Sequence, residues 1–229
     1  MTHYNFHLSA DGLSNADKRF SWEAHFGGDF DLVDYVVGRA NVLIDYEALL
    51  GDELRIFDPN QGNYTLEVSG SVRAGGTEFA GVFHHVSRHL SDRAKQRAIA
   101  WNVAGVRALR RFEARGSTVD VLAGAGRVVA RADVDYAWIG NADVVVRRPV
   151  HARVGLFAHA LGGIVGVDQG VAGRQTQHDG RLEGGIRLEG RAGAIELFAG
   201  YERRIDAYPT DAQRLAQRWA FAGFRFVNR

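Results

Sequence analysis

Cysteine is absent from this chain of 229 residues. Disulfide frameworks, thiolate metal sites and cysteine nucleophiles are therefore excluded. A chain without cysteine is also suited to an oxidising compartment such as the bacterial periplasm. Proline is scarce, at three residues, whereas glycine reaches 28. Because proline cannot donate to the hydrogen-bonded ladder of a sheet, this balance favours paired strands joined by tight bends.

Long apolar runs and an excess of one charge sign are also lacking. No apolar run approaches the roughly 18 residues of a transmembrane helix. Residues 1–12 lack the basic start and apolar centre of a secretory signal. We therefore expect either a cytoplasmic protein or a mature chain from which a signal peptide was removed. Lys and Arg number 28 against 27 Asp and Glu, a net charge of +1, so no nucleic-acid partner is predicted.

Alternation of charged and apolar residues dominates the sequence. Between positions 178 and 193 the charged residues are Arg181, Glu183, Arg187, Glu189 and Arg191, and the apolar ones of opposite parity are Leu182, Ile186 and Leu188. A period of two predicts a strand with one charged and one apolar face. Similar runs predict about twelve strands. We place them at 3–10, 18–27, 38–50, 62–74, 76–89, 96–112, 117–130, 134–148, 150–166, 179–192, 194–204 and 214–228.

The connections between these segments alternate in length. Long polar connections are predicted at 11–17, 51–61, 90–95, 167–178 and 205–213, and short ones at 74–76, 113–117, 148–150 and 191–194. Two connections break the order, because 28–37 is long and 131–133 is short. Short turns at one end and long loops at the other are typical of outer-membrane barrels. In the last strand Trp219 and Phe221 share the parity of Arg225, which predicts a bulge or a misplaced boundary.

Alternation alone does not say which face is inside. A soluble sandwich or lipocalin-like barrel buries its apolar face, whereas a membrane barrel turns that face to lipid. The charged face mixes both signs, as in a lumen filled by ion pairs, and the apolar face is rich in small residues with aromatics near strand ends. The sequence therefore predicts a single all-β domain over 1–229. We expect an antiparallel up-and-down transmembrane β-barrel of about twelve strands in the bacterial outer membrane, with membrane lipid as its partner. A soluble lipid-binding β-barrel is the alternative.

Candidate chemistry lies in the stretch FHHVSRHLSDR, residues 83–93. His85 and Ser87 share the parity of Phe83, so we expect both on the lipid-facing side of one strand. On the next strand Asn102 is the single polar residue in a row of alanines and a valine with the same orientation. These three residues fit a hydrolytic triad. Ser87 would be the nucleophile, His85 the general base, and Asn102 the group that holds the imidazole tautomer.

The same stretch resembles the H-x-S motif of outer membrane phospholipase A, a twelve-stranded barrel whose Ser, His and Asn triad faces lipid. Trp101-Asn102 is similar to the W-N pair on that family's following strand. The resemblance implies a lipid acyl-ester hydrolase. Arg88 and His89 depart from it, because they replace the family's Asn-Gly. Lipid A deacylases carry a similar motif, but the carboxylate that their triad needs is not evident, since Glu113 lies far along the next strand.

A further resemblance joins His85-x-Ser87-x-His89-Leu90-x-Asp92 to the H-x-S-S-H-L-G-D run of a family of uncharacterised bacterial outer-membrane proteins. It covers the middle third of the chain and implies the same fold without naming a reaction. A non-catalytic barrel with a structural or narrow transport role therefore stays open, and in that case the polar cluster is held by local hydrogen bonds. A homodimer is a candidate assembly.

Metal-binding candidates are few. Ser91 and Asp92 could hold calcium or supply oxyanion donors beside the triad. His89 with Asp92 could bind a metal or support the loop, and loop support is favoured because two ligands do not make a site. The run DPNQG, 58–62, is interpreted as a turn rather than a cation loop.

Overall fold

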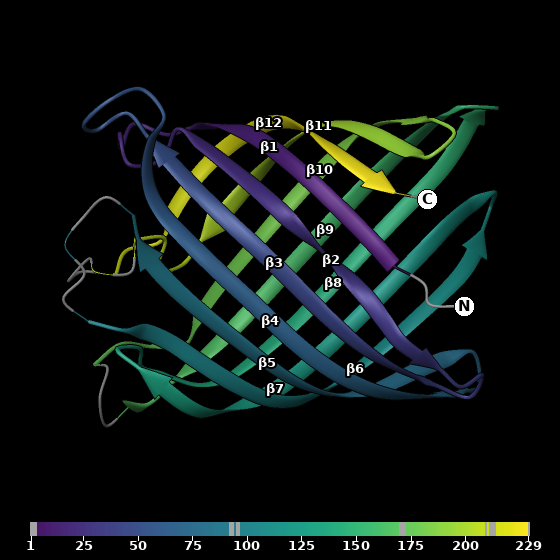
Figure 1. Cartoon of the computed structure of the whole chain (residues 1–229), viewed down its shortest axis with the longest axis horizontal. Helices are drawn as coiled ribbons and strands as arrows, with labels where there is room; N and C mark the ends of the chain where they lie inside the picture. Colours follow the sequence, from purple (N-terminus) through teal and green to yellow (C-terminus); the bar gives the residue numbers. More distant parts are fainter. Residues whose placement is uncertain are drawn as a thin grey trace.

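The computed structural model describes residues 4–91, 94, 97–169, 173–208, 210 and 214–228. Twelve antiparallel strands close into one barrel (Figure 1). Their bounds are β1 Tyr4–Ser14, β2 Trp22–Asp34, β3 Arg39–Gly51, β4 Asp58–Ala74, β5 Thr77–Leu90, β6 Ile99–Ala114, β7 Ser117–Ala132, β8 Tyr136–His151, β9 Val154–Val167, β10 Gln177–Glu189, β11 Gly193–Arg204 and β12 Gln217–Asn228. The predicted all-β, up-and-down barrel is confirmed. Among the described residues, no helix is long and apolar enough to cross a membrane.

Each strand pairs with its neighbour in sequence, and β12 pairs with β1 to close the cylinder. The two chain termini lie at one end, and the longer loops gather at the other (Figure 1). We call these the short-turn end and the long-loop end. The region 28–37, predicted as a long connection, is mostly strand, since β2 continues to Asp34 and only residues 35–38 turn. That correction restores the alternation of long and short connections at this position.

Two of the short turns are two-residue hairpins. Gly75 and Gly76 have φ values of 57° and 74° between β4 and β5, and Arg115 and Gly116 have φ values of 52° and 76° between β6 and β7. Positive φ at both central residues matches the twist of the flanking strands, and glycine adopts it without steric cost. These turns set the register of the two hairpins around β5 and β6.

Two local predictions are wrong. The run 58–62 is not a turn but the start of β4, and it lies inside the barrel end. The amide of Asn60 donates to the carbonyl of Arg19 at 2.7 Å, and that of Gln61 donates to the carbonyl of Ala207 at 2.9 Å. In the last strand the predicted bulge is absent, because β12 pairs with both neighbours without a shift in register, but the predicted start at 214 is misplaced, since β12 begins at Gln217. The polar residues of 58–62 contact loops that are distant in sequence, which local pattern cannot reveal.

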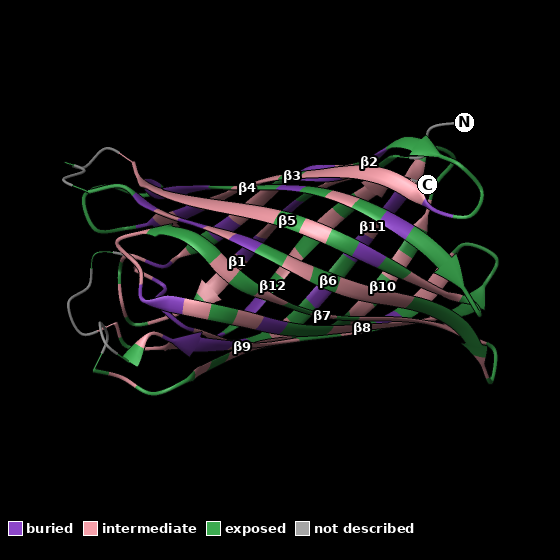
Figure 2. Ribbon diagram, turned by 90° about the horizontal axis from the view of Figure 1, so that it is seen from below, coloured by how far each residue is buried: buried purple, intermediate pink, exposed green. Residues whose placement is uncertain are grey.

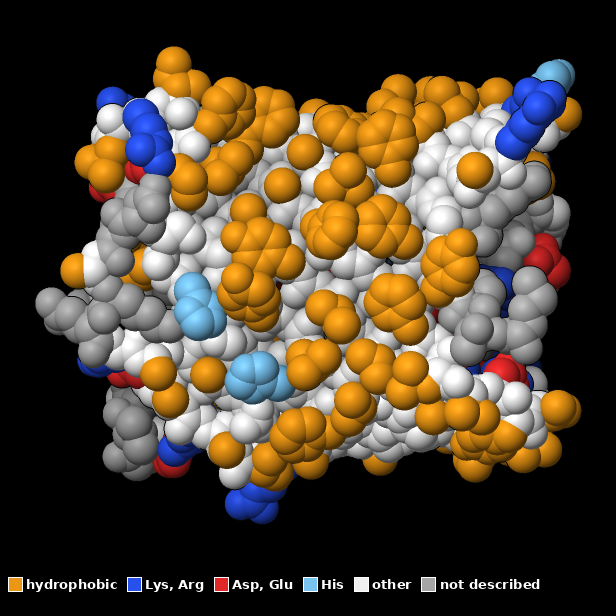
Figure 3. All heavy atoms as spheres, viewed as in Figure 1, with side chains coloured by type: hydrophobic (Ala, Val, Ile, Leu, Met, Phe, Trp, Pro, Cys, Tyr) orange, Lys and Arg blue, Asp and Glu red, His pale blue; other side chains and the backbone are white. Residues whose placement is uncertain are grey.

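The apolar face of the barrel points outward. Leu182 is 60% exposed, whereas the side chain of its neighbour Arg181 is 16% exposed. Exposed and less exposed residues alternate along the strands (Figure 2). Apolar side chains cover the visible wall, and charged ones lie near its two ends (Figure 3). Such a surface would be unstable in water and matches the hydrocarbon of a bilayer. The protein is therefore a membrane barrel, and the soluble alternative is excluded.

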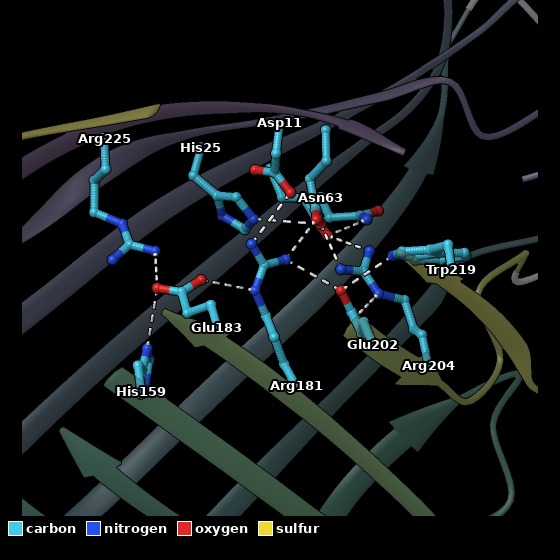
Figure 4. A network of polar contacts seen from close by, with 12 residues as sticks. Asp11, His25, Asn63, His159, Arg181, Glu183, Glu202, Arg204, Trp219 and Arg225 are labelled. Atoms are coloured by element: carbon cyan, nitrogen blue, oxygen red, sulfur yellow. Dashed lines mark hydrogen bonds and ion pairs between the residues drawn. The ribbon is translucent and has the colours of Figure 1, made fainter. Parts of the chain in front are cut away.

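The lumen contains a dense network of ion pairs (Figure 4). Arg181 contacts four carboxylates, those of Asp11, Glu23, Glu183 and Glu202, at 3.1 to 3.2 Å. Arg204 contacts Glu23 at 2.5 Å, Glu47 at 2.7 Å and Glu202 at 2.6 Å. Phe221 lies under Arg181, with 3.7 Å from the guanidinium carbon to the ring centre. Trp219 and Phe221 therefore share the parity of the arginines because they pack on them.

The long-loop end is closed from inside by the connection that follows β11. Ile205, Asp206 and Ala207 are buried there. Ala207 packs in an apolar cluster with Phe20, Leu49, Phe157, Phe198, Trp219 and Phe221. The hydroxyl of Tyr136 donates to the Asp206 carboxylate at 2.6 Å. The apolar core of this barrel thus lies in the outer part of its lumen and not between sheets.

Candidate functional site

The candidate site lies on the outer wall of β5 and β6, toward the long-loop end. Antiparallel pairing places His85 opposite Asn102 and Ser87 opposite Ala100. Ser87 is three residues from Leu90, where β5 ends. All three candidate side chains are half-buried. Their neighbours on the same face of β4 are Leu66 and Tyr64, which are 44% and 51% exposed, so the polar groups lie among outward-facing apolar side chains.

His85 and Asn102 are joined directly. Nδ1 of His85 lies 2.6 Å from Oδ1 of Asn102. Because a side-chain amide oxygen only accepts, His85 must donate from Nδ1, and its Nε2 then carries a lone pair. An imidazole in this tautomer is ready to accept a proton through Nε2. His85 and Asn102 are thus neighbours on the outer wall, as the sequence predicts.

Ser87 has a different partner from the one that the triad pattern predicts. Its Oγ lies 2.6 Å from Nε2 of His89. Among the described residues this is the only hydrogen-bond partner of the Ser87 hydroxyl, and the expected contact with His85 is not formed in this conformation. Ser87 lies between two imidazoles on one strand face, because positions 85, 87 and 89 share the same parity. The hydroxyl is directed toward the second of them.

His89, for which the sequence favours loop support, lies in the site. Its ring makes a T-shaped contact with that of Tyr64, with centroids 5.3 Å apart and planes at 84°. Tyr64 in turn packs on Tyr46 at 5.0 Å. The sequence could have indicated His89 as a site residue, because it has the same parity as Ser87 and therefore lies on the same face of the strand. Figure 3 shows histidine side chains exposed among the apolar ones of the wall.

A β-bulge lies beside Asn102. On β7, Ala130 pairs with Asn102 and Val128 with Val103, so that Val129 is the extra residue. Bulges re-aim side chains and are frequent next to functional sites. Here Val128 packs against an apolar cluster of the lumen, whereas Val129 is 55% exposed. Sequence alternation does not reveal the bulge, because a run of small apolar residues reads the same with or without one extra position.

The calcium candidates Ser91 and Asp92 stay a prediction. Asp92 lies outside the described residues. The backbone amide of Ser91 donates to the carbonyl of Asn60 at 2.9 Å, so it is not free to stabilise an oxyanion. Calcium takes six to eight oxygen ligands, whereas the contacts of Ser87 and Asn102 are with imidazoles.

One group of metal-ligand type lies in the lumen, among the described residues. Ligand atoms of Glu23, His25 and Glu47 are within 4.8 Å of one another. Both carboxylates already bind the guanidinium of Arg204, at 2.5 and 2.7 Å. His25 also binds Asp45 at 2.9 Å. A fixed cation thus occupies the place where a metal would have to enter, and the group belongs to the ion-pair network.

Comparison with known proteins places the fold. No family model and no curated protein matches this chain. Outer membrane phospholipase A from Escherichia coli superimposes with a TM-score of 0.58 at 12% identity, over 99% of this chain and 90% of that one. The Salmonella typhi outer membrane phospholipase, solved as a dimer with bound calcium, gives 0.55 at 12% identity over 99% and 90%. LpxR from Salmonella typhimurium gives 0.50 at 10% identity over 97% and 99%.

The chain has the fold of a bacterial outer-membrane barrel. The resemblance to outer membrane phospholipase A, first based on the H-x-S motif and the following W-N pair, is confirmed at the level of the fold. Identities of 10 to 12% carry no chemistry from those proteins to this one. Any activity must therefore be argued from the side chains on this outer-membrane barrel itself.

Proposed function

We propose that this protein is an outer-membrane enzyme that hydrolyses acyl esters of membrane lipid, with Ser87 as the nucleophile. The observation that carries the proposal is the pair of His85 and Asn102, joined at 2.6 Å on the lipid-facing wall, with Ser87 on the same face one pleat away. Polar side chains that face hydrocarbon cost free energy unless they are hydrogen-bonded. A shared chemical role explains why this wall carries several of them together.

The mechanism follows from the tautomer of His85. Nε2 of His85 takes the proton from the Ser87 hydroxyl as Oγ attacks the ester carbonyl carbon, and a tetrahedral intermediate forms. The C–O bond to the alcohol then breaks, and the imidazolium returns the proton to the leaving oxygen. Water hydrolyses the acyl-serine by the same proton route and releases a fatty acid. Asn102 holds the ring through Nδ1 throughout.

The position of the site supports a lipid substrate. A lipid already beside the barrel needs no entry channel, because the reacting groups are on the outer wall. Phe83 and Tyr64, 44% and 51% exposed, flank the site and would contact acyl chains. The site lies toward the long-loop end of β5, where ester groups near the bilayer surface would lie if that end marks the membrane boundary.

A variant with Ser87 replaced by Ala tests this proposal. S87A should release no fatty acid from phospholipid or lipopolysaccharide in mixed micelles, while it folds to the same heat-modifiable barrel on a gel. Removing a nucleophile lowers the rate by several orders of magnitude, on the order of 10⁶ in serine hydrolases. The assay is run with and without calcium. Wild-type protein that hydrolyses no lipid in either condition would rule out the enzyme and leave the non-catalytic barrel.

We also propose that the enzyme forms a homodimer. Chemical cross-linking in micelles, with and without calcium, tests it directly. A dimer whose formation tracks hydrolysis would support the assembly, and an active monomer would exclude it.

A further inference from the structure

We infer that His89 is a second proton acceptor for Ser87, so that the nucleophile has an imidazole on each side along β5. This inference rests on the proposed function and adds a catalytic residue to it. The distance from Ser87 Oγ to His89 Nε2 is 2.6 Å, as short as a strong hydrogen bond between a hydroxyl and a ring nitrogen. In the conformation observed, His89 is the residue that would take the proton.

Backbone geometry makes the arrangement possible. His85, Ser87 and His89 follow one another at alternate positions of a regular strand, so their side chains project from one face. The serine hydroxyl moves between staggered positions by rotation about a single bond. One rotation directs Oγ toward His89, and another carries it back toward His85. Each imidazole can thus receive the same proton without any movement of the backbone.

The surroundings of His89 hold its ring in place. Tyr64 lies directly opposite Ser87 on β4 and makes a T-shaped contact with the His89 ring, with the ring centroids 5.3 Å apart. Gly62 lies opposite His89, and a Cβ there would come within 2.7 Å of the Tyr46 hydroxyl. The glycine therefore leaves room for Tyr46 to pack on Tyr64 beside the histidine. A packed ring is a better base than a mobile one, because its orientation is fixed before reaction.

The two imidazoles differ in what orients them. His85 is tied to an amide oxygen through Nδ1, and His89 is packed against an aromatic ring. When His89 acts, its Nε2 takes the Ser87 proton as Oγ bonds to the ester carbon. The imidazolium then gives that proton to the departing alcohol. Atoms and charges balance as they do in the His85 route, so either residue can complete the acyl transfer.

Glutamine variants at both positions test the inference. H85Q and H89Q should each retain a measurable part of the wild-type rate of lipid hydrolysis, and the two residual rates should add up to about the wild-type rate, because the remaining imidazole accepts the proton. The double variant has neither base and should fall roughly 10²-fold or more, toward the level of S87A, because general-base catalysis contributes roughly 10² to 10⁴. A fluorophosphonate probe reports the reactivity of Ser87 directly, and the pH profile of labelling should change its acid limb in each single variant. H178Q, which changes an exposed histidine on β10, should match wild type.

Three results would overturn the inference. His89 is idle if H89Q equals wild type and H85Q alone equals S87A. His89 would be the sole base if the reverse pattern held. A faster H89Q variant would show that His89 merely restrains the serine. In each case wild-type hydrolysis persists, so the proposed function survives. Loss of all wild-type activity would remove both.

A spectroscopic measurement separates contact from catalysis. In wild-type barrels labelled with ¹⁵N-histidine, S87A should shift the Nε2 resonance of His89, since it removes a 2.6 Å hydrogen bond. H85Q should leave that resonance in place. A His89 signal that does not respond to S87A would contradict the inference, whatever the activity of the variants.

Discussion

At the residue scale, Asn102 has an unusual environment for an amide. It stands on the outer wall of β6, where the flanking positions of the same orientation are Ala100 and Ala104. Its oxygen is satisfied by His85 at 2.6 Å, which offsets part of the cost of placing an amide in hydrocarbon. The pairing therefore serves two purposes, because it satisfies the amide and fixes the imidazole tautomer.

Replacing Asn102 by Ala should lower lipid hydrolysis about 5- to 10-fold through the loss of one hydrogen bond worth about 1 kcal/mol. The barrel itself should remain as stable, since an apolar side chain suits this wall. Initial rates in mixed micelles and urea unfolding followed by gel mobility measure the two effects. V106A, on the same face of β6 and 67% exposed in the parent, is the matched control. Unchanged hydrolysis in N102A would show that the tautomer of His85 is irrelevant.

At the element scale, the connection between β11 and β12 closes the lumen through charged loop residues. Arg174, in the connection before β10, binds Asp135 at 2.6 Å and Asp206 at 2.7 Å. Burial by itself raises the pKa of Asp135, but hydrogen bonds and charge from Arg174, with the charge of Arg214, outweigh burial and lower that pKa below 3.8. We call residues 205–207, which close this end of the lumen, the cap. The cap is thus held, through Arg174, by a carboxylate that stays ionised at neutral pH.

The cap should loosen in acid. Because the pKa of Asp135 is lower in the folded state than the unfolded value of 3.8, its stabilising contribution is complete above that value. It is lost as pH falls through the folded pKa. Pepsin cleavage around 205–208 should therefore accelerate below about pH 4. D135N lacks the charge and should be cleaved faster, and the ratio of its rate to that of wild type should approach one in acid. A ratio independent of pH would contradict this role.

At the scale of the whole molecule, the barrel carries its apolar surface outside and its charges inside. The lumen retains a cavity of about 500 Å³ lined by Arg181, Arg204 and His25 among others. Arg181 and the four carboxylates that it contacts join different strands across the lumen next to this cavity (Figure 4). We therefore predict that this network limits the flow of ions through the lumen.

Replacing Arg181 by Ala should both weaken and open the barrel. Four carboxylates would lose a shared partner, and breaking a buried ion pair from one side typically costs about 3 to 5 kcal/mol. The urea midpoint in micelles should fall, and conductance in planar bilayers should rise above that of wild type. R148A removes an exposed arginine and should change neither. High conductance of the wild-type protein would show that the network does not block the lumen.

Much of this architecture could be predicted from sequence because alternation is a local property. The parity of Leu182 against Arg181 predicts the two faces, and the parity of His85 against Asn102 predicts two neighbours on one wall. The count of strands follows from the runs themselves. The buried start of β4 and the lumen role of Trp219 could not be predicted, since the first depends on contacts with Arg19 and Ala207 and the second on packing against Arg204, which local alternation does not encode.

The sequence by itself determined that this chain forms an all-β barrel with polar and apolar faces, because a period of two needs only adjacent residues. Tertiary structure decided which side chains from different strands come into contact. Closure of the cylinder brought Arg181 to Asp11 and Glu23, and the pairing of β4 with β5 placed the ring of Tyr64 against that of His89. Side-chain rotation and the pairing of distant strands, which no local pattern encodes, are the physical reasons.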